Sequence, residues 1–136
     1  MVLLWLINMP VIQTHEKTYR LLIIDDDPGW IQFAKANLGK SFEVNVTTDL
    51  ENALARLRQN HYDLIIVSSR RLDVVERIHT QFPQERIVVA AGQETVGEAI
   101  YAYRLGVFDY FAKDFRSEII TKKLNEAIQK PVVNPV

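Results

Sequence analysis

A run of four aliphatic residues, Leu21–Ile24, leads directly into three aspartates and then Pro28. An aliphatic run of this kind is typical of a strand buried on both faces, and such strands occur in parallel sheets covered by helices. Asp27 followed by Pro28 is typical of a helix start, with aspartate as the N-cap and proline as the first helical residue. The sequence therefore places Asp25 and Asp26 at the carboxyl end of a parallel strand, which is the edge where open α/β sheets bind ligands.

Two adjacent carboxylates in a half-buried cleft repel each other unless a cation neutralises them. In proteins that cation is usually a divalent metal ion or a basic side chain. The identity of the cation beside Asp25 and Asp26 decides what chemistry this site can perform.

The rest of the chain alternates strand-like apolar segments with helix-like amphipathic segments. Four further strands are predicted at residues 42–46, 63–67, 87–90 and 108–112, and five helices at 28–38, 49–57, 72–79, 95–105 and 117–128. The short connections between these segments require right-handed crossovers of a parallel sheet. The prediction is an α/β, flavodoxin-like three-layer sandwich whose five-stranded parallel sheet has the order 2-1-3-4-5.

Composition excludes several classes of function. With 16 basic and 17 acidic residues, the chain has no strong field that would attract nucleic acid. The lack of cysteine excludes disulfides, thiolate chemistry and cysteine-bound zinc, and it suits a cytoplasmic protein, which is the predicted location. The three histidines are scattered without metal-ligand spacing, so we predict surface or structural roles for them.

The two ends of the chain differ from the middle. We predict an N-terminal extension over residues 1–19, one domain over 20–129 and a tail over 130–136. Residues 2–8 are apolar but too few to span a membrane, and no positively charged segment precedes them as in a secretory signal. We therefore predict no membrane association. One hypothesis is that residues 2–8 form an extra strand or helix that covers an exposed surface or a partner.

Three segments share a pattern with one known family: the acidic pair after the first strand, Tyr62–Val67 at the third strand, and Asp109–Phe115 at the fifth. Over about residues 20–129 they resemble the receiver domain of two-component response regulators, a CheY-like family whose last strand carries a D-Y-x-x-K-P-F pattern that includes Lys113. The resemblance implies a signalling domain in a two-component system or phosphorelay, and not an enzyme.

The same resemblance implies a phosphorylation site from which this chain departs. The family's phosphoacceptor aspartate, which also helps to hold Mg²⁺, corresponds here to Ser68, and a hydroxyl is a weak nucleophile without a general base. The switch hydroxyl corresponds to Ala91, the proline after the lysine corresponds to Asp114, and the loop after the third strand is shorter. We therefore predict a degenerate receiver, or pseudo-receiver, with no cofactor and at best weak Mg²⁺ binding at Asp25 and Asp26.

Basic side chains follow the vacant acceptor position. We predict that Arg70 or Arg71, together with Lys113, neutralises Asp25 and Asp26 permanently, because an unneutralised buried pair is costly. The alternative is that both arginines point to solvent and Lys113 alone pairs with the aspartates.

A predicted partner surface lies around the fifth strand. Tyr110 corresponds to the family's aromatic switch, and because Ala91 supplies no hydroxyl to move it, we predict a static surface or interface residue. Tyr101, Tyr103 and Phe108 make this region aromatic, as interface hot spots often are. We predict that the face formed by the fourth helix, fifth strand and fifth helix binds a protein partner or a second copy.

The predicted function is phosphorylation-independent signalling by protein–protein contact. One alternative is a phosphorelay receiver with a non-standard acceptor such as Asp73, although Asp73 more naturally begins the third helix as an acidic first-turn residue. Another alternative is a small-molecule binder or enzyme that uses the same cleft.

Overall fold

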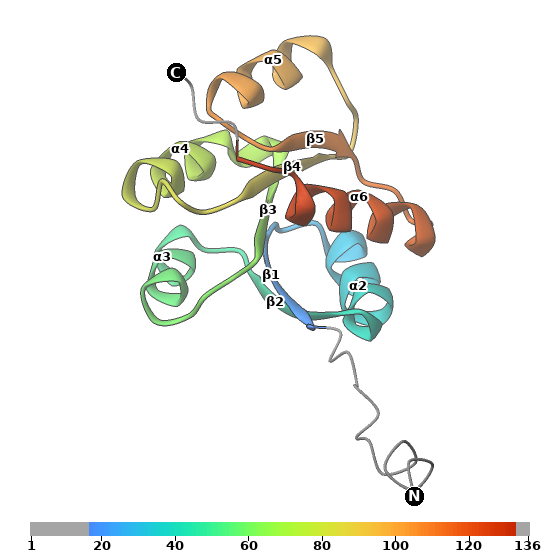
Figure 1. The fold of residues 1–136 in the computed structure, drawn as a ribbon. Coiled ribbons are helices and arrows are strands. Elements are labelled where there is room, and N and C mark those ends of the chain that lie inside the picture. The colour runs from blue at the N-terminus through green and yellow to red at the C-terminus, as the bar shows by residue number, and fades with distance from the viewer. Residues whose placement is uncertain (1–16, 133–136) are drawn as a thin grey trace, which may run out of the picture.

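The computed structural model describes residues 17–132, which form a five-stranded parallel sheet in the order β2-β1-β3-β4-β5 (Figure 1). This is the predicted strand order. The strands are β1 Tyr19–Ile24, β2 Phe42–Thr47, β3 Leu64–Ser68, β4 Ile87–Ala91 and β5 Asp109–Ala112. The α-helices are α2 Pro28–Asn37, α3 Leu50–Gln59, α4 Leu72–Gln81, α5 Val96–Arg104 and α6 Ser117–Gln129, and short 3₁₀ turns occupy Leu38–Lys40 (η1) and Ser69–Arg71 (η2).

Helices cover both faces of the sheet. α2 and α6 lie on one side and α3 and α4 on the other (Figure 1). Along β1, Leu21 and Ile23 belong to the core on the α2 side, whereas Leu22 and Ile24 belong to the core on the α3 side. All four residues are buried, which confirms the prediction that this strand is covered on both faces.

The helix starts follow their local sequence. Asp27 caps α2, because its Oδ1 accepts hydrogen bonds from the backbone N–H of Gly29 at 3.1 Å and of Trp30 at 3.3 Å. Pro28 is the first helical residue, as predicted. Helix ends follow it too. Gly106, two residues after the end of α5, has a φ of 95°, a conformation that favours glycine.

The strand register brings four distant residues to one edge of the sheet. Ser68 pairs with Ala90 across β3 and β4, and Ala91 pairs with Ala112 across β4 and β5. The N–H of Asp25 donates to Thr47 O at 3.1 Å, and the N–H of Lys113 donates to Ala91 O at 2.7 Å. Because the strands are parallel, Asp25, Ser68, Ala91 and Lys113 therefore meet at their carboxyl ends.

Residues 2–8, with their predicted covering role, lie outside the described residues. Between residues 17 and 132, no helix is both long enough and apolar enough to cross a bilayer.

Candidate functional site

A cleft of about 710 Å³ opens at the carboxyl edge of the sheet. Its lining comes from the β1–α2 connection, the end of β3, the β4–α5 connection with the first turn of α5, and the residue after β5. The lining residues include Asp26, Asp27, Ser68, Arg70, Glu98 and Lys113. This is the edge at which the sequence placed the acidic pair.

A buried ion pair forms the floor of this site. Lys113 Nζ lies 2.8 Å from Asp25 Oδ2, with the two side chains 6% and 1% exposed. Because both groups are buried, the attraction between the two charges is weakly screened by solvent. The other carboxylate oxygen of Asp25 accepts a hydrogen bond from the N–H of Asp27 at 3.0 Å. A charge as deeply buried as Asp25 requires such partners.

Lys113 has a second acidic partner, Asp27, which the sequence analysis did not include in the site. Lys113 Nζ lies 3.2 Å from Asp27 Oδ2. Burial raises the pKa of Asp27, but the hydrogen bond and charge of Lys113, with the helix N–H groups that Asp27 caps, bring it below its ordinary value. Successive side chains of an extended segment point in opposite directions. Asp25 and Asp27 therefore both point toward Lys113, whereas Asp26 points away from that lysine.

Asp26 takes Arg70 as its partner. Arg70 Nη2 lies 2.6 Å from Asp26 Oδ1, and both side chains are 68% exposed. An exposed pair of this kind contributes little to stability. The pair does place the positive charge of Arg70 against Asp26, the more exposed carboxylate of the acidic pair.

Arg71 does not reach the acidic pair. Its guanidinium donates to both carboxylate oxygens of Asp73, at 3.2 and 3.4 Å. The hydrogen bond and charge of Arg71 lower the pKa of Asp73 against the smaller opposing effect of burial. Asp73 lies in the first turn of α4. Of the two arginines considered from sequence, only Arg70 contacts an aspartate of the pair.

Ser68 is buried and is the last residue of β3. Its hydroxyl oxygen accepts a hydrogen bond from the N–H of Arg70 at 3.3 Å and so caps η2. Among the described residues, the Ser68 side chain makes this one hydrogen bond. A serine nucleophile needs a base to take its proton, and this arrangement supplies a backbone N–H instead.

These residues fit Mg²⁺ poorly. Asp25 and Asp26 are suitable oxygen ligands, but Lys113 and Arg70 already neutralise them. The third position, Ser68, adds no charge. Across residues 17–132, no group of three or more acidic or histidine side chains has a geometry that could hold a metal ion.

Tyr110 is buried, so the prediction of a surface residue is wrong. Its ring belongs to the same core cluster as Ala91. Its hydroxyl donates to Glu98 Oε1 at 2.6 Å and accepts from the N–H of Thr95 at 3.1 Å. Burial raises the pKa of Tyr110, and the hydrogen bond to the Glu98 carboxylate raises it further.

Glu98 was missed in the sequence analysis, although a signal for it was present. Thr95 caps α5 by accepting from the Glu98 N–H at 3.2 Å, and Thr-x-x-Glu is the capping-box pattern. In the usual box the glutamate binds the N–H of the capping residue. Here the Tyr110 hydroxyl lies between the two and bonds to each.

The predicted aromatic surface is centred on α5. Val96, Ile100, Tyr101 and Tyr103 of this helix are exposed. Phe108 instead packs against the core on the α2 side, and the guanidinium of Arg86 lies 4.6 Å from the centre of its ring.

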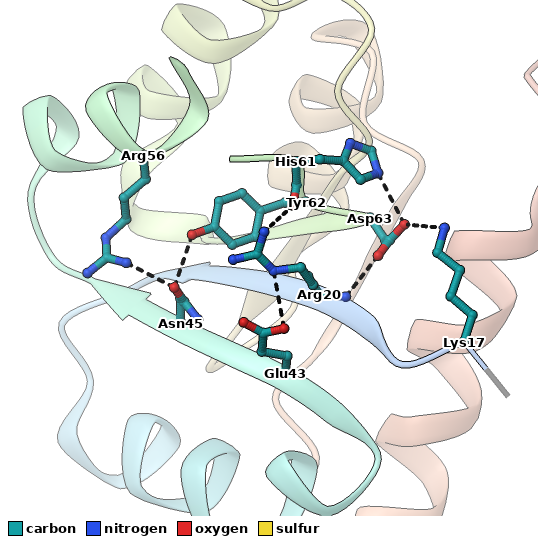
Figure 2. A network of polar contacts seen from close by, with 8 residues as sticks. All are labelled: Lys17, Arg20, Glu43, Asn45, Arg56, His61, Tyr62 and Asp63. Carbon is teal, nitrogen blue, oxygen red and sulfur yellow. Dashed lines mark hydrogen bonds and ion pairs between the residues drawn. The ribbon is translucent and has the colours of Figure 1, made fainter. Parts of the chain in front are cut away.

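A polar network at the opposite, amino end of the sheet was also missed (Figure 2). Asp63 is its centre, because its carboxylate accepts from the N–H of Arg20 at 2.8 Å and lies 3.3 Å from His61 Nε2 and 3.4 Å from Lys17 Nζ. Burial raises the pKa of Asp63, but the Arg20 N–H and the Lys17 charge bring it below its ordinary value.

The second half of this network joins β2 to α3 and β3. Asn45 Oδ1 accepts from the Tyr62 hydroxyl at 3.1 Å and from Arg56 Nη1 at 2.9 Å, while Arg20 Nε lies 3.3 Å from a Glu43 carboxylate oxygen. The residues come from segments far apart in the sequence, so local patterns did not reveal the network. None of the network's residues lines the cleft at the carboxyl edge.

Comparisons with known proteins agree with this geometry. The family model for the response regulator receiver domain matches residues 21–125. The photosynthetic apparatus regulatory protein RegA of Rhodobacter capsulatus is 30% identical over 125 residues, which cover 85% of this chain and 68% of RegA. The acid tolerance regulatory protein ActR of Rhizobium meliloti is 29% identical, over 82% of this chain and 59% of ActR.

Solved structures of response regulators have the same fold. One from Thermotoga maritima superposes with a TM-score of 0.73 at 21% identity, covering 84% of this chain and all of that one. An orphan response regulator of Helicobacter pylori gives 0.69 at 26% identity, over 82% and 97% of the two chains. The fold and the site thus define a CheY-like signalling domain. The chain belongs to the response regulator receiver domain family.

Proposed function

We propose that this receiver domain signals through protein–protein contact without being phosphorylated at the family's acceptor position. Receiver domains belong to two-component systems. In this one, which we infer to be degenerate, the chain's own side chains neutralise the acidic site and no Mg²⁺ is required.

One observation carries the proposal: both members of the acidic pair already have a cation from this chain. Lys113 lies against Asp25, and Arg70 lies against Asp26. A metal ion would have to displace Arg70 and compete with a buried lysine, and Ser68 would offer it no negative charge. Without Mg²⁺, negative charge that builds up during phosphoryl transfer would lack its main stabilising ion.

The switch region supports the same proposal. Ala91 has no hydroxyl that could bind a phosphoryl group. Tyr110 is held inward by Glu98 and Thr95, both on the connection into α5 and its first turn. In this proposal the α5–β5–α6 face has one fixed conformation, and a signal passes when that face is occupied by a protein.

Intact-mass measurement after incubation with acetyl phosphate and Mg²⁺ tests the proposal. We expect the mass of the wild-type chain to stay unchanged. A stable gain of one phosphoryl group, whichever residue carried it, would contradict signalling that does not depend on phosphorylation.

The same experiment separates the alternative acceptors. A gain that disappears in Asp73→Asn would identify Asp73 as a non-standard acceptor in a phosphorelay. A gain that disappears in Ser68→Ala would identify the serine. The structure favours neither, since Asp73 is bonded to Arg71 and the Ser68 hydroxyl caps η2.

A further inference from the structure

The outer edge of β2 leaves backbone groups without a strand partner. β2 pairs with β1 on one side, and within residues 17–132 no strand pairs with its other side. The N–H of Asp25 donates to Thr47 O, so the backbone of Thr47 faces β1. Backbone direction alternates along a strand, so the N–H and C=O groups of Val44 and Val46 face outward. Such an edge is a template on which a further strand can pair.

β2 has none of the features that usually prevent this pairing. It is six residues long, contains no lysine or proline, and keeps one continuous register with β1, without a bulge. Its one charged residue is Glu43, and Arg20 Nε lies 3.3 Å from that carboxylate, which offsets the charge. The opposite edge of the sheet differs, since β5 has four residues and begins at the charged Asp109. An unprotected edge like that of β2 is expected to be covered.

The chain itself contains a segment with matching chemistry. Residues 2–8, which lie outside the described residues, read Val-Leu-Leu-Trp-Leu-Ile-Asn and contain no charge, glycine or proline. This composition suits a strand about as long as β2. Pro10 has no N–H and ends any such pairing just beyond the segment. One face of the added strand lies beside Val44 and Val46, whose half-buried side chains pack against the core on the α2 side.

The connection between this segment and β1 favours one orientation. Tyr19 is level with Phe42, so β1 and β2 begin at the same end of the sheet. A strand on the outer side of β2 lies about 10 Å from β1, which is two strand spacings, and residues 9–18 are long enough to span that distance. Because these residues lead into the start of β1, the segment ends at the amino end of β2 and runs antiparallel to it.

We propose that residues 2–8 form a sixth strand that pairs antiparallel with the outer edge of β2. The outward backbone groups of β2 then have partners, and the sheet no longer ends in an edge that could pair with another molecule. This pairing is separate from the proposed signalling function, because β2 and β5 are at opposite edges of the sheet.

Amide hydrogen exchange of the full chain, followed by two-dimensional NMR, tests the pairing residue by residue. We expect the outward N–H groups, those of Val44 and Val46, to exchange slowly in the wild type, although no strand of the described residues accepts from them. The inward N–H groups, those of Glu43 and Asn45, face β1 and serve as the internal control. The protection should be the same over a range of protein concentrations, because the pairing lies within one molecule.

Two proline substitutions remove the added strand. N–H directions alternate along a strand, so either Leu4→Pro or Trp5→Pro removes an N–H that faces β2, whatever the register. In that variant we expect the outward N–H groups to exchange at least about tenfold faster, while the inward groups stay protected. Gln13→Pro, in the connection to β1, is the matched control and should exchange as the wild type does.

Three results would overturn the added strand. The first is rapid, unprotected exchange of the outward N–H groups in the wild type. The second is protection that neither proline substitution reduces. The third is protection that rises with protein concentration, which would identify β2 of a second copy as the occupant of the edge. None of these results bears on phosphorylation, which intact mass reports independently.

Discussion

The Tyr110 hydroxyl donates a hydrogen bond of 2.6 Å to Glu98 Oε1, and this contact joins β5 to the first turn of α5. The same hydroxyl accepts from the N–H of Thr95, the residue that caps α5. A buried side chain thus completes the N-terminus of α5, the helix whose side chains Val96, Ile100, Tyr101 and Tyr103 are exposed.

Tyr110→Phe removes both hydrogen bonds and leaves the ring in place. We expect the free energy of unfolding to fall by about 1–2 kcal/mol, since the Thr95 N–H and the Glu98 carboxylate each lose a partner. Glu98→Gln should cost less, because its amide oxygen can still accept from the hydroxyl. Urea denaturation measures the free energy of unfolding of both variants. If Tyr110→Phe is as stable as wild type, this contact does not stabilise the fold.

Lys113→Met leaves the Asp25 carboxylate buried without its cation. We expect a loss of about 3–5 kcal/mol, as is usual when one partner of a buried pair is removed. The exposed pair behaves differently, and Arg70→Met should cost less than about 1 kcal/mol.

The double variant Lys113→Met with Asp25→Asn checks the cause of that loss. Removing the second charge should recover part of the lost stability, because the asparagine no longer requires a buried cation. If the double variant is no more stable than Lys113→Met alone, the loss does not come from an unpaired charge on Asp25, and the charge account of this site is wrong.

Asp63→Asn tests the polar network at the amino end of the sheet. The pKa of Asp63 lies below its ordinary value of 3.8 in the folded chain, so its charged form stabilises the protein above that pH. This contribution is lost as the pH falls through the folded-state pKa. We expect the variant to be less stable by about 1 kcal/mol at neutral pH.

The pH dependence is the sharper part of this prediction. The difference between wild type and Asp63→Asn should shrink as the pH is lowered from 3.8 towards the folded-state pKa. Glu126→Gln, on the exposed face of α6, is the control variant. A difference that stays constant with pH would mean that the Asp63 charge makes no contribution. Chemical denaturation at a series of pH values supplies the data.

Ser68→Asp reinstates a carboxylate at the end of β3. Three neighbouring acidic side chains then share one edge of the sheet, and their repulsion should lower the melting temperature in the absence of divalent ions. Millimolar Mg²⁺ should restore part of that loss in the variant, because the third charge supplies the ligand that the wild type lacks. Equal Mg²⁺ responses of variant and wild type in thermal melts would contradict this view of Ser68.

Local sequence patterns predicted the sheet because each of them acts over a few residues. The aliphatic runs of β1, β3 and β4 required burial on both faces, and Asp27-Pro28 required a helix start. The short connections then left one parallel topology. These requirements are independent of distant contacts, which explains why the strand order was confirmed.

The pairing within the site could be predicted only in part. Charge balance required basic partners for the acidic pair, and Lys113 and Arg70 are those partners in the structure. Which carboxylate each cation would contact depended on the direction of side chains in the β1–α2 connection. Lys113 lies against Asp25 and Asp27, and Arg70 lies against Asp26. The inward Tyr110 was mispredicted, because its main partner, Glu98, lies twelve residues away on another element.

Titration of the wild-type chain with Mg²⁺, followed by two-dimensional amide NMR, tests most directly whether the acidic pair is already neutralised by this chain. With Lys113 and Arg70 beside the aspartates, we expect the amide resonances of Asp25–Asp27 and Ser68 to stay unchanged at sub-millimolar Mg²⁺. A saturable shift of those resonances in that range would show a functional metal site and would contradict the account.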